Sequence, residues 1–483
     1  MQPITILLII AAYFGVLILI SFLTSSKESE ENNDTFFKAK RQSPWYIVAF
    51  GMIGASLSGV TFISAPGWVE ASNFGYMQTV FGYMVGYLVI GTILMPLYYR
   101  MNLTSIYSYL EERFGFYSYK VGSTFFILSR IVGASFRLFL VANVLQLILF
   151  NQLGVPFWLT VTITILLIWV YTFKSGIKTI VWTDTLQTLF MLTAVGVAIY
   201  SVSQDLGISS SNIVSFISKS SLSKMFFFDD FTSANYFWNR FISGAFIAIV
   251  MTGLDQDMMQ KNLTCKSLKD AQKNMFWFTI VLVIANLVFL SLGVLLSEYA
   301  RQNGIDAHKD DLFPVLAQYH LGTGVFVFFL VGLIAAAYSS ADSALTSLTT
   351  SFSVDILNIE KKYDEKKQIK IRKQIHVLLS FVLILVIMAF KYFIKDASVI
   401  KEIFTWAGYT YGPLLGLYSF GLFTKWQVKD MLVPVVAIVA PILSIVISAN
   451  SKVWFNFDFG FFVLILNGAL TFLGLILIRS KQN

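Results

Sequence analysis

The second long apolar run of the chain contains the stretch Gly51-Met-Ile-Gly-Ala-Ser-Leu-Ser-Gly-Val-Thr-Phe-Ile-Ser-Ala-Pro-Gly67. The run is long enough to cross a membrane, but its middle is crowded with Gly, Ser and Thr, which weaken a helix. We therefore expect an interruption near Gly54 to Thr61. An interrupted helix frees backbone carbonyls at mid-membrane, where a cation, a substrate or another buried group must satisfy them. The alternative is a face of small residues for close helix packing.

The composition is that of a membrane protein. Of the 483 residues, 56% are hydrophobic and 46 are Phe, and repeated apolar runs of roughly 20 residues indicate spanning helices. The net charge of +8 arises from Lys and Arg in short loops between these runs, which indicates membrane topology rather than a nucleic-acid partner. The single cysteine, Cys265, excludes an intramolecular disulfide framework, and the three histidines are far apart and suggest no metal cluster.

The apolar runs predict an all-α integral membrane protein with about thirteen transmembrane helices. The predicted spans are 3–23, 45–71, 76–99, 119–148, 155–173, 180–203, 237–260, 275–298, 322–356, 374–394, 401–424, 431–449 and 456–478. No stretch between them is long enough to fold alone as a soluble domain.

The distribution of basic residues predicts the orientation. If the N-terminus faces outside, most of the 35 Lys and Arg residues fall in inner loops, among them Lys261 after the span 237–260 and the cluster from Lys361 to Lys373. We therefore expect the N-terminus outside and the C-terminus in the cytoplasm. The five-span unit that comprises spans two to six then begins inside, and the unit that comprises spans seven to eleven begins outside. Two units of opposite orientation are what an inverted repeat requires. The predicted parts are an N-terminal extra helix with its loop (1–44), a five-helix unit (45–203), an outer loop (204–236), a second five-helix unit (237–425) and two C-terminal extra helices (426–483).

A stripe of hydroxyl groups marks the span 322–356. Ala336, Ser339, Ser340 and Ser343 recur at spacings of three and four, so they share one helix face, which Asp342 borders. Na⁺ is a hard cation and prefers oxygen ligands such as hydroxyls, carbonyls and carboxylates. A carboxylate inside a membrane helix is costly and usually functional. The stripe therefore favours a cation site over a merely polar packing face.

Other charged residues lie inside predicted spans. Asp184 falls in the inner third of the span 180–203, at a depth similar to that of Asp342, so the two acids could share a cation or a proton. Arg130 and Arg137 are seven residues apart and share a face. Two buried guanidinium groups need partners. They either grip an anionic substrate or form structural pairs with Asp184, Asp342 or Glu70.

Several of these motifs together resemble the sodium:solute symporter family over nearly the whole chain. The motifs are the Gly54–Thr61 stretch, Thr104-Ser with Tyr109-Leu-Glu and Arg113-Phe-Gly115, Trp182-Thr-Asp-Thr-Leu-Gln187, Asp255-Gln256, Ser339-Ser340 and Gly412-Pro-Leu-Leu-Gly416. The resemblance implies a LeuT-type 5+5 inverted repeat with one extra N-terminal and two extra C-terminal helices. It also implies Na⁺ as the coupling ion.

The resemblance assigns candidate sites. The common Na⁺ site would use carbonyls of Gly54, Leu57 and Ala336 with hydroxyls of Ser339 and Ser340. A second Na⁺ or proton site would use Asp184, Ser339, Asp342 and Ser343, although the family carries a Ser where Asp342 stands. The substrate would contact Ser56, Ser58, Thr61, Met77, Phe81 and Arg137.

These features predict a Na⁺-coupled symporter that imports a small organic solute across the plasma membrane by alternating access. The solute would be sugar-like, or anionic such as a sialic acid or a carboxylate. The alternative is a channel or a Na⁺-independent carrier on the same fold. No paired catalytic groups or nucleotide-binding loop appear, so we expect no enzyme. We expect a monomer in the lipid bilayer.

Overall fold

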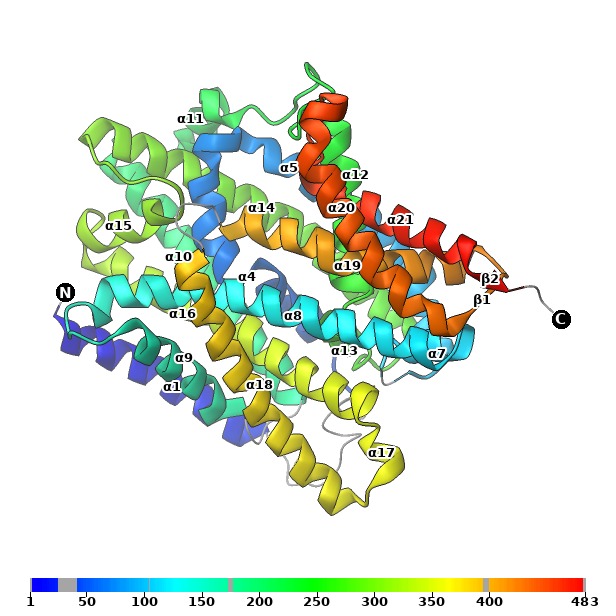
Figure 1. Cartoon of the computed structure of the whole chain (residues 1–483). Coiled ribbons are helices and arrows are strands. Elements are labelled where there is room, and N and C mark those ends of the chain that lie inside the picture. Colours follow the sequence, from blue (N-terminus) through cyan, green and yellow to red (C-terminus); the bar gives the residue numbers. More distant parts are fainter. Residues whose placement is uncertain (1, 25–40, 104, 173–176, 394–398, 481–483) are drawn as a thin grey trace.

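The computed structural model describes residues 2–24, 41–103, 105–172, 177–393 and 399–480, which form an almost entirely helical bundle (Figure 1). Its long helices are α1 (Pro3–Thr24), α4 (Trp45–Ser72), α5 (Tyr76–Val89), α8 (Phe116–Leu145), α9 (Phe157–Thr172), α10 (Ile177–Asp205), α12 (Phe237–Ala248), α14 (Leu268–Asn303), α16 (Gly322–Ser351), α18 (Glu365–Phe393), α19 (Val399–Phe423), α20 (Val433–Phe455) and α21 (Val463–Leu477).

Shorter elements connect or extend these helices. The short α-helices are α6 (Met95–Arg100), α7 (Ser108–Arg113), α11 (Ile213–Lys219), α13 (Gln256–Asn262), α15 (Leu312–Tyr319) and α17 (Ile359–Lys362). Single π-helical turns are η3 (Ile90–Leu94), η4 (Gln146–Phe150), η7 (Ile249–Gly253) and η9 (Phe352–Ile356). The 3₁₀ turns are η2 (Asn73–Gly75), η5 (Ser210–Asn212), η6 (Ser221–Ser223), η8 (Lys309–Asp311), η10 (Asp430–Leu432) and η11 (Gly460–Phe462). Two-residue strands β1 (Gln427–Val428) and β2 (Arg479–Ser480) pair antiparallel, with Gln427 opposite Ser480.

Every predicted span overlaps helical segments of the structure, but the spans 76–99 and 237–260 each comprise more than one element. Nine helices of the described part are long and apolar enough to cross a membrane, or ten if α12–η7 and α13 form one bent span. The number is below thirteen because Trp45–Arg100 is one stretch of 56 residues that covers two predicted spans and Phe157–Trp169 is shorter. The Tyr- and Gly-rich α19 is likewise not among the nine. The predicted span ends at 173 and 394 lie outside the described residues.

The predicted span 237–260 is not one continuous helix. It bends by 70° between η7 and α13. At the bend the Asp255 side chain accepts hydrogen bonds from the backbone amides of Asp257 and Met258, and so caps a new helix. η7 ends at Gly253, and the capping acid two residues later begins the next helix, which explains the break.

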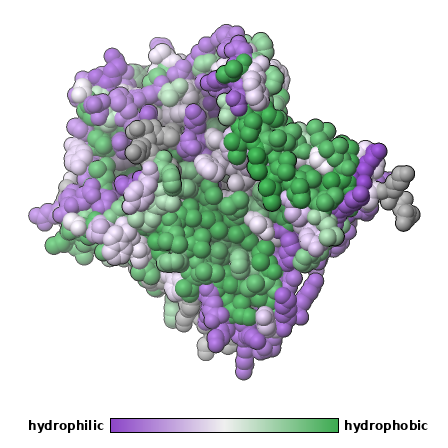
Figure 2. Space-filling model, in the orientation of Figure 1, coloured by the Kyte–Doolittle hydropathy of each residue, from purple (hydrophilic) through white to green (hydrophobic). Residues whose placement is uncertain are grey.

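The outer surface fits a bilayer. Figure 2 shows a broad apolar area between two hydrophilic margins, one over α11 and α15 and the other over α17 and the C-terminal end. Such an arrangement is expected of a bundle whose middle faces lipid. Inside it, α4 packs against α10, α14 and α16, which places the broken stretch at the centre of the molecule.

Candidate functional site

The helix α4 is broken where the sequence predicts. Ser58 has φ 39° and ψ 171°, outside the helical region, while the residues on both sides continue as helix. A non-glycine residue at positive φ is uncommon and often marks a functional site. The break at Ser58 is therefore a candidate functional site.

The broken stretch lies against the hydroxyl stripe of α16. A Cβ added at Gly54 would lie 3.3 Å from Ser339 Oγ and would collide with Thr188 Oγ1. A Cβ added at Gly59 would lie 3.6 Å from the Cα of Ala337. The glycines thus allow the α4 backbone to approach α16, and this brings the predicted carbonyl and hydroxyl ligands to one place. Leu57 and Ala336 are buried on the same two helices.

The two serine hydroxyls are oriented in a way that suits a cation. Ser339 Oγ donates to Asp184 Oδ1 at 2.6 Å, and Ser340 Oγ donates to the carbonyl of Ala337 at 3.1 Å. Because each proton is already engaged, the oxygen lone pairs are left to accept. An oxygen-only donor set of hydroxyls and carbonyls fits Na⁺.

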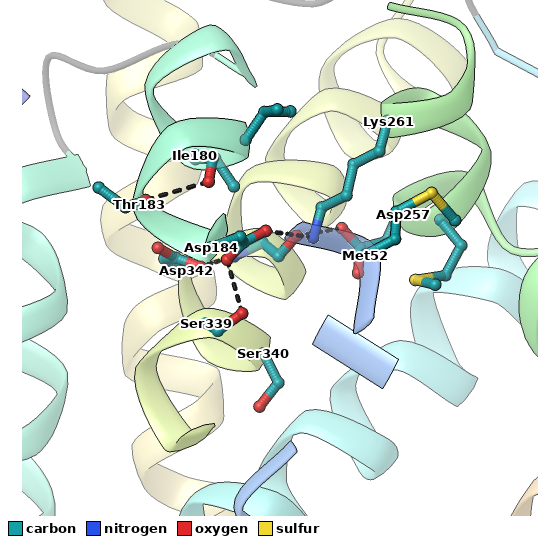
Figure 3. Close-up of polar contacts among 12 residues, drawn as sticks. Met52, Ile180, Thr183, Asp184, Asp257, Lys261, Ser339, Ser340 and Asp342 are labelled. Carbon is teal, nitrogen blue, oxygen red and sulfur yellow. Dashed lines mark hydrogen bonds and ion pairs between the residues drawn. The ribbon is translucent and has the colours of Figure 1, made fainter. Parts of the chain in front are cut away.

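A buried lysine reaches the same place from α13. Lys261 Nζ lies 2.7 Å from Asp184 Oδ2, and both side chains are almost fully buried (Figure 3). The prediction that Lys261 is an inner-loop charge is wrong, since its side chain is only 1% exposed. The positive-inside rule counts a charge near a span end and does not distinguish a loop from a helix that folds back into the protein.

The other two members of the predicted second site, Asp342 and Ser343, have different neighbours. Asp342 is fully buried, and its charge acts on the Lys261 ammonium together with that of Asp257. Ser343 Oγ donates to Asp257 Oδ1 at 2.7 Å. The structure therefore brings Asp184 and Ser339 into direct contact, whereas the Ser343 hydroxyl is directed toward the bend of the α12–α13 span.

Arg130 is neutralised by two acids of that bend. Its guanidinium forms an ion pair with Asp257 and lies 3.8 Å from Asp255 Oδ2. Tyr411 of α19 donates to Asp255 Oδ2 at 2.5 Å and completes the cluster. The expectation that Asp184, Asp342 or Glu70 would pair with a buried arginine is wrong for Arg130. Sequence spacing could not reveal its partners, because Asp255 and Asp257 lie on a helix far along the chain.

Arg137 differs from Arg130. Both arginines line a cavity beside the break of α4, but their partners are not alike. The Nε of Arg137 is buried without a hydrogen-bond partner, and no acidic side chain of the described residues forms an ion pair with Arg137. A buried guanidinium without an acid is costly unless a ligand compensates it.

The cavity includes four predicted substrate residues and several that sequence reasoning missed. Ser56, Ser58, Thr61 and Arg137 line it. Met77 and Phe81 do not: Met77 is buried in the core, and the Phe81 ring stacks on Phe226 at 6.1 Å. The missed polar residues are Tyr76, Tyr83, Tyr87, Thr252 and Asn286. The three tyrosines are spaced by seven and four residues, a one-face helical pattern that the sequence does contain.

Comparison with known proteins identifies the family of the chain. The family model described as "Sodium:solute symporter family" matches residues 36–428. A sodium/sialic acid symporter of Aliivibrio fischeri is 24% identical over 481 residues, covering 95% of this chain and 91% of that protein. A sodium-coupled monocarboxylate transporter 2 of Bos taurus is 23% identical over 436 residues, covering 87% and 68%.

A solved structure shares the fold. The substrate-bound outward-open state of a Na⁺-coupled sialic acid symporter has a TM-score of 0.81 and 20% identity, covering 99% of both chains. A nucleobase-cation-symport-1 family transporter has a TM-score of 0.53 with 14% identity. These likenesses confirm the predicted LeuT-type fold.

The chain belongs to the sodium:solute symporter family. It is a multi-pass membrane transporter that couples the symport of a solute to Na⁺ by alternating access. The prediction of a coupled symporter is thereby confirmed, in preference to the channel or uncoupled carrier.

Proposed function

We propose that the chain takes up a small organic anion together with Na⁺, and that Arg137 binds the anion. The observation that carries this proposal is the contrast in compensation, since Arg130 has two acids and Arg137 has none among the described residues. A guanidinium binds a carboxylate through two parallel hydrogen bonds. A carboxylate in the cavity would supply the charge that Arg137 lacks.

The remaining cavity groups favour a hydroxylated or carboxylated solute. The Tyr76 and Tyr83 hydroxyls of α5 lie 3.1 Å apart. Ser58 and Thr61 of α4 line the same cavity. These groups can donate to and accept from sugar hydroxyls. The names of the relatives indicate sialic acid and monocarboxylates as the first solutes to test. The sialic-acid pattern has a Gln near Phe81 and an Arg near Gly133, and neither residue stands at the aligned place in this sequence, so the monocarboxylates are tested with equal weight.

The proposed Na⁺ site consists of the carbonyls of Gly54, Leu57 and Ala336 and the hydroxyls of Ser339 and Ser340. A helix that breaks at Ser58 exposes the carbonyls of its last turn, residues 54–57. The contact between Gly54 and Ser339 supports this grouping. We propose that a monovalent cation is surrounded by a second group of residues, which are Asp184, Ser339, Asp342 and Ser343.

We also propose a monomer in the plasma membrane that moves its solute without chemical conversion. Its N-terminus would face outside and its C-terminus the cytoplasm. Figure 1 supports this sidedness, since α7, α17 and the C-terminal end gather on one side and α11, α15 and the N-terminal end on the other. The five-helix units 45–203 and 237–425 would then be the inverted repeats.

Uptake into proteoliposomes tests the proposal. Sialic acid, lactate and glucose are compared, each with an inward Na⁺ gradient and with K⁺ in its place. We expect Na⁺-dependent uptake of one of the two anions and none of glucose. Na⁺-dependent uptake of glucose with neither anion accepted would contradict the role of Arg137.

A further inference from the structure

The salt bridge between Lys261 and Asp184 lies where a coupling cation is expected. Asp184 has two carboxylate oxygens, and both are occupied: Oδ2 by Lys261 Nζ at 2.7 Å and Oδ1 by Ser339 Oγ at 2.6 Å. Figure 3 shows the Lys261 side chain extending from α13 to Asp184, with Ser339 and Ser340 on the far side of the carboxylate. The ammonium therefore occupies one edge of the predicted second cation site.

The surroundings of this ammonium are those of a bound inorganic cation. Its side chain is 1% exposed, that of Asp184 is not exposed, and the charges of Asp257 and Asp342 act on it as well. A lysine ammonium carries one positive charge in compact form and seeks oxygen acceptors, as Na⁺ does. The protein thus supplies to Asp184 and Asp342 the same charge that an ion would bring.

A second Na⁺ would have to compete with this lysine. Two positive charges in contact with the same carboxylate repel each other strongly in a buried setting. A Na⁺ that bound Asp184 would also have to displace an ammonium, which would be left buried away from its closest acid. A Na⁺ at the common site competes less with Lys261, because the proposed ligands of that site are neutral carbonyls and hydroxyls.

We propose that Lys261 is a built-in cation that fills the second cation position, so that one Na⁺, held at the common site, binds per transport cycle. The cation that Asp184 and Asp342 share is then part of the protein. It is attached to α13, the inner half of the bent α12–α13 span, and is not released with the solute. This inference rests on the proposed Na⁺-coupled function and specifies its ion stoichiometry.

Equilibrium binding of ²²Na⁺ to the purified, solute-free protein tests the inference. The wild type is expected to bind one Na⁺ with a Hill coefficient near one. Lys261→Met keeps the length of the side chain but removes the charge, and it is expected to bind two. Lys261→Arg retains a cation and is expected to bind one, and the double variant Lys261→Met with Asp184→Asn is expected to return to one.

The outcomes separate the inference from the function beneath it. Two Na⁺ bound by the wild type would overturn the built-in cation but leave the symporter intact. This count needs no variant, so it decides the question even if Lys261→Met does not fold. A folded Lys261→Met that still binds one Na⁺ would also overturn it. No saturable ²²Na⁺ binding by the wild type would contradict the proposed Na⁺ site itself.

Discussion

Arg130 and Arg137 lie about two turns apart on one face of α8, yet their surroundings are opposite. Arg130 lies in an inner network where Asp255 and Asp257 balance its charge, and Lys261 balances Asp184 close by. Arg137 lines the same cavity as Arg130 but forms no ion pair with an acidic side chain of the described residues. A compensated charge can hold helices together, whereas an uncompensated one is available to a ligand.

The difference between the two regions makes a general expectation. Substitutions in the inner network should lower the stability of the protein. Substitutions at the open groups should lower ligand affinity with little effect on stability. Single substitutions in each region test whether stability and ligand affinity separate in this way.

Asp257→Asn should be the most disruptive single change. It removes the closest acid of Arg130 and leaves a buried guanidinium undercompensated, which costs about 3–5 kcal/mol of unfolding free energy. Thermal unfolding in detergent, followed by intrinsic fluorescence, measures the loss. Asp230→Asn, which changes an exposed loop acid, is the matched control. An Asp257→Asn protein as stable as the control would break the distinction between the regions.

Ser340→Ala should weaken Na⁺ binding without unfolding the protein. Loss of one buried oxygen ligand costs about 1–3 kcal/mol, or roughly 5- to 150-fold in the half-saturating Na⁺ concentration. Titration of uptake against Na⁺ in proteoliposomes measures the shift. Ser347→Ala, which removes a buried hydroxyl bonded only to the Ala344 carbonyl of its own helix, is the control. An unchanged Na⁺ dependence would remove Ser340 from the site.

Arg137→Lys should lower solute affinity by about 1–2 kcal/mol, because Lys retains the charge but not the planar fork. Solute binding measured by thermal shift with the accepted anion, at saturating Na⁺, gives the change. Arg100→Lys, at an exposed position of α6, serves as the control. If protein yield and thermal stability fall instead of affinity, Arg137 is structural and belongs with Arg130.

The surface pair His308–Glu70 should have the smallest effect on stability of the groups considered. Glu70 accepts a hydrogen bond from His308 Nδ1 at 2.9 Å, and this contact with its negative charge raises the pKa of His308 above its ordinary value. Protonated His308 therefore stabilises the folded state, and the contribution is full at low pH and lost as the pH rises through the raised pKa. The His308 side chain is 62% exposed, so we expect less than about 1 kcal/mol.

Thermal unfolding of the wild type and of His308→Asn, compared at about pH 5.5 and pH 9, measures this contribution. The wild type should lead slightly at the lower pH and the two proteins should coincide at the higher one. A difference that grows toward high pH would have the wrong sign for this pair.

Part of the candidate site is visible in the sequence. The small-residue stretch around Ser58 predicts a broken helix because glycine and hydroxyl residues weaken a helix in a short segment of chain. The serine stripe of α16 follows from helical spacing alone. The tyrosine face of α5 follows from the same helical spacing, although it was not among the predicted substrate residues. Local rules suffice wherever one element defines the feature.

The amino-acid sequence by itself determined the helical membrane class, the positions of the spans, the break in α4 and the family. These depend on hydropathy, short-range spacing and motifs, which act within a helix or along the chain. Only the tertiary structure decided which charges meet. It placed Lys261 on Asp184 across 77 positions of the chain and Arg130 on Asp257 across 127, and it left Arg137 facing the cavity. Charge pairing in a membrane protein depends on which helices pack together, and spacing within one helix carries no information about its neighbours.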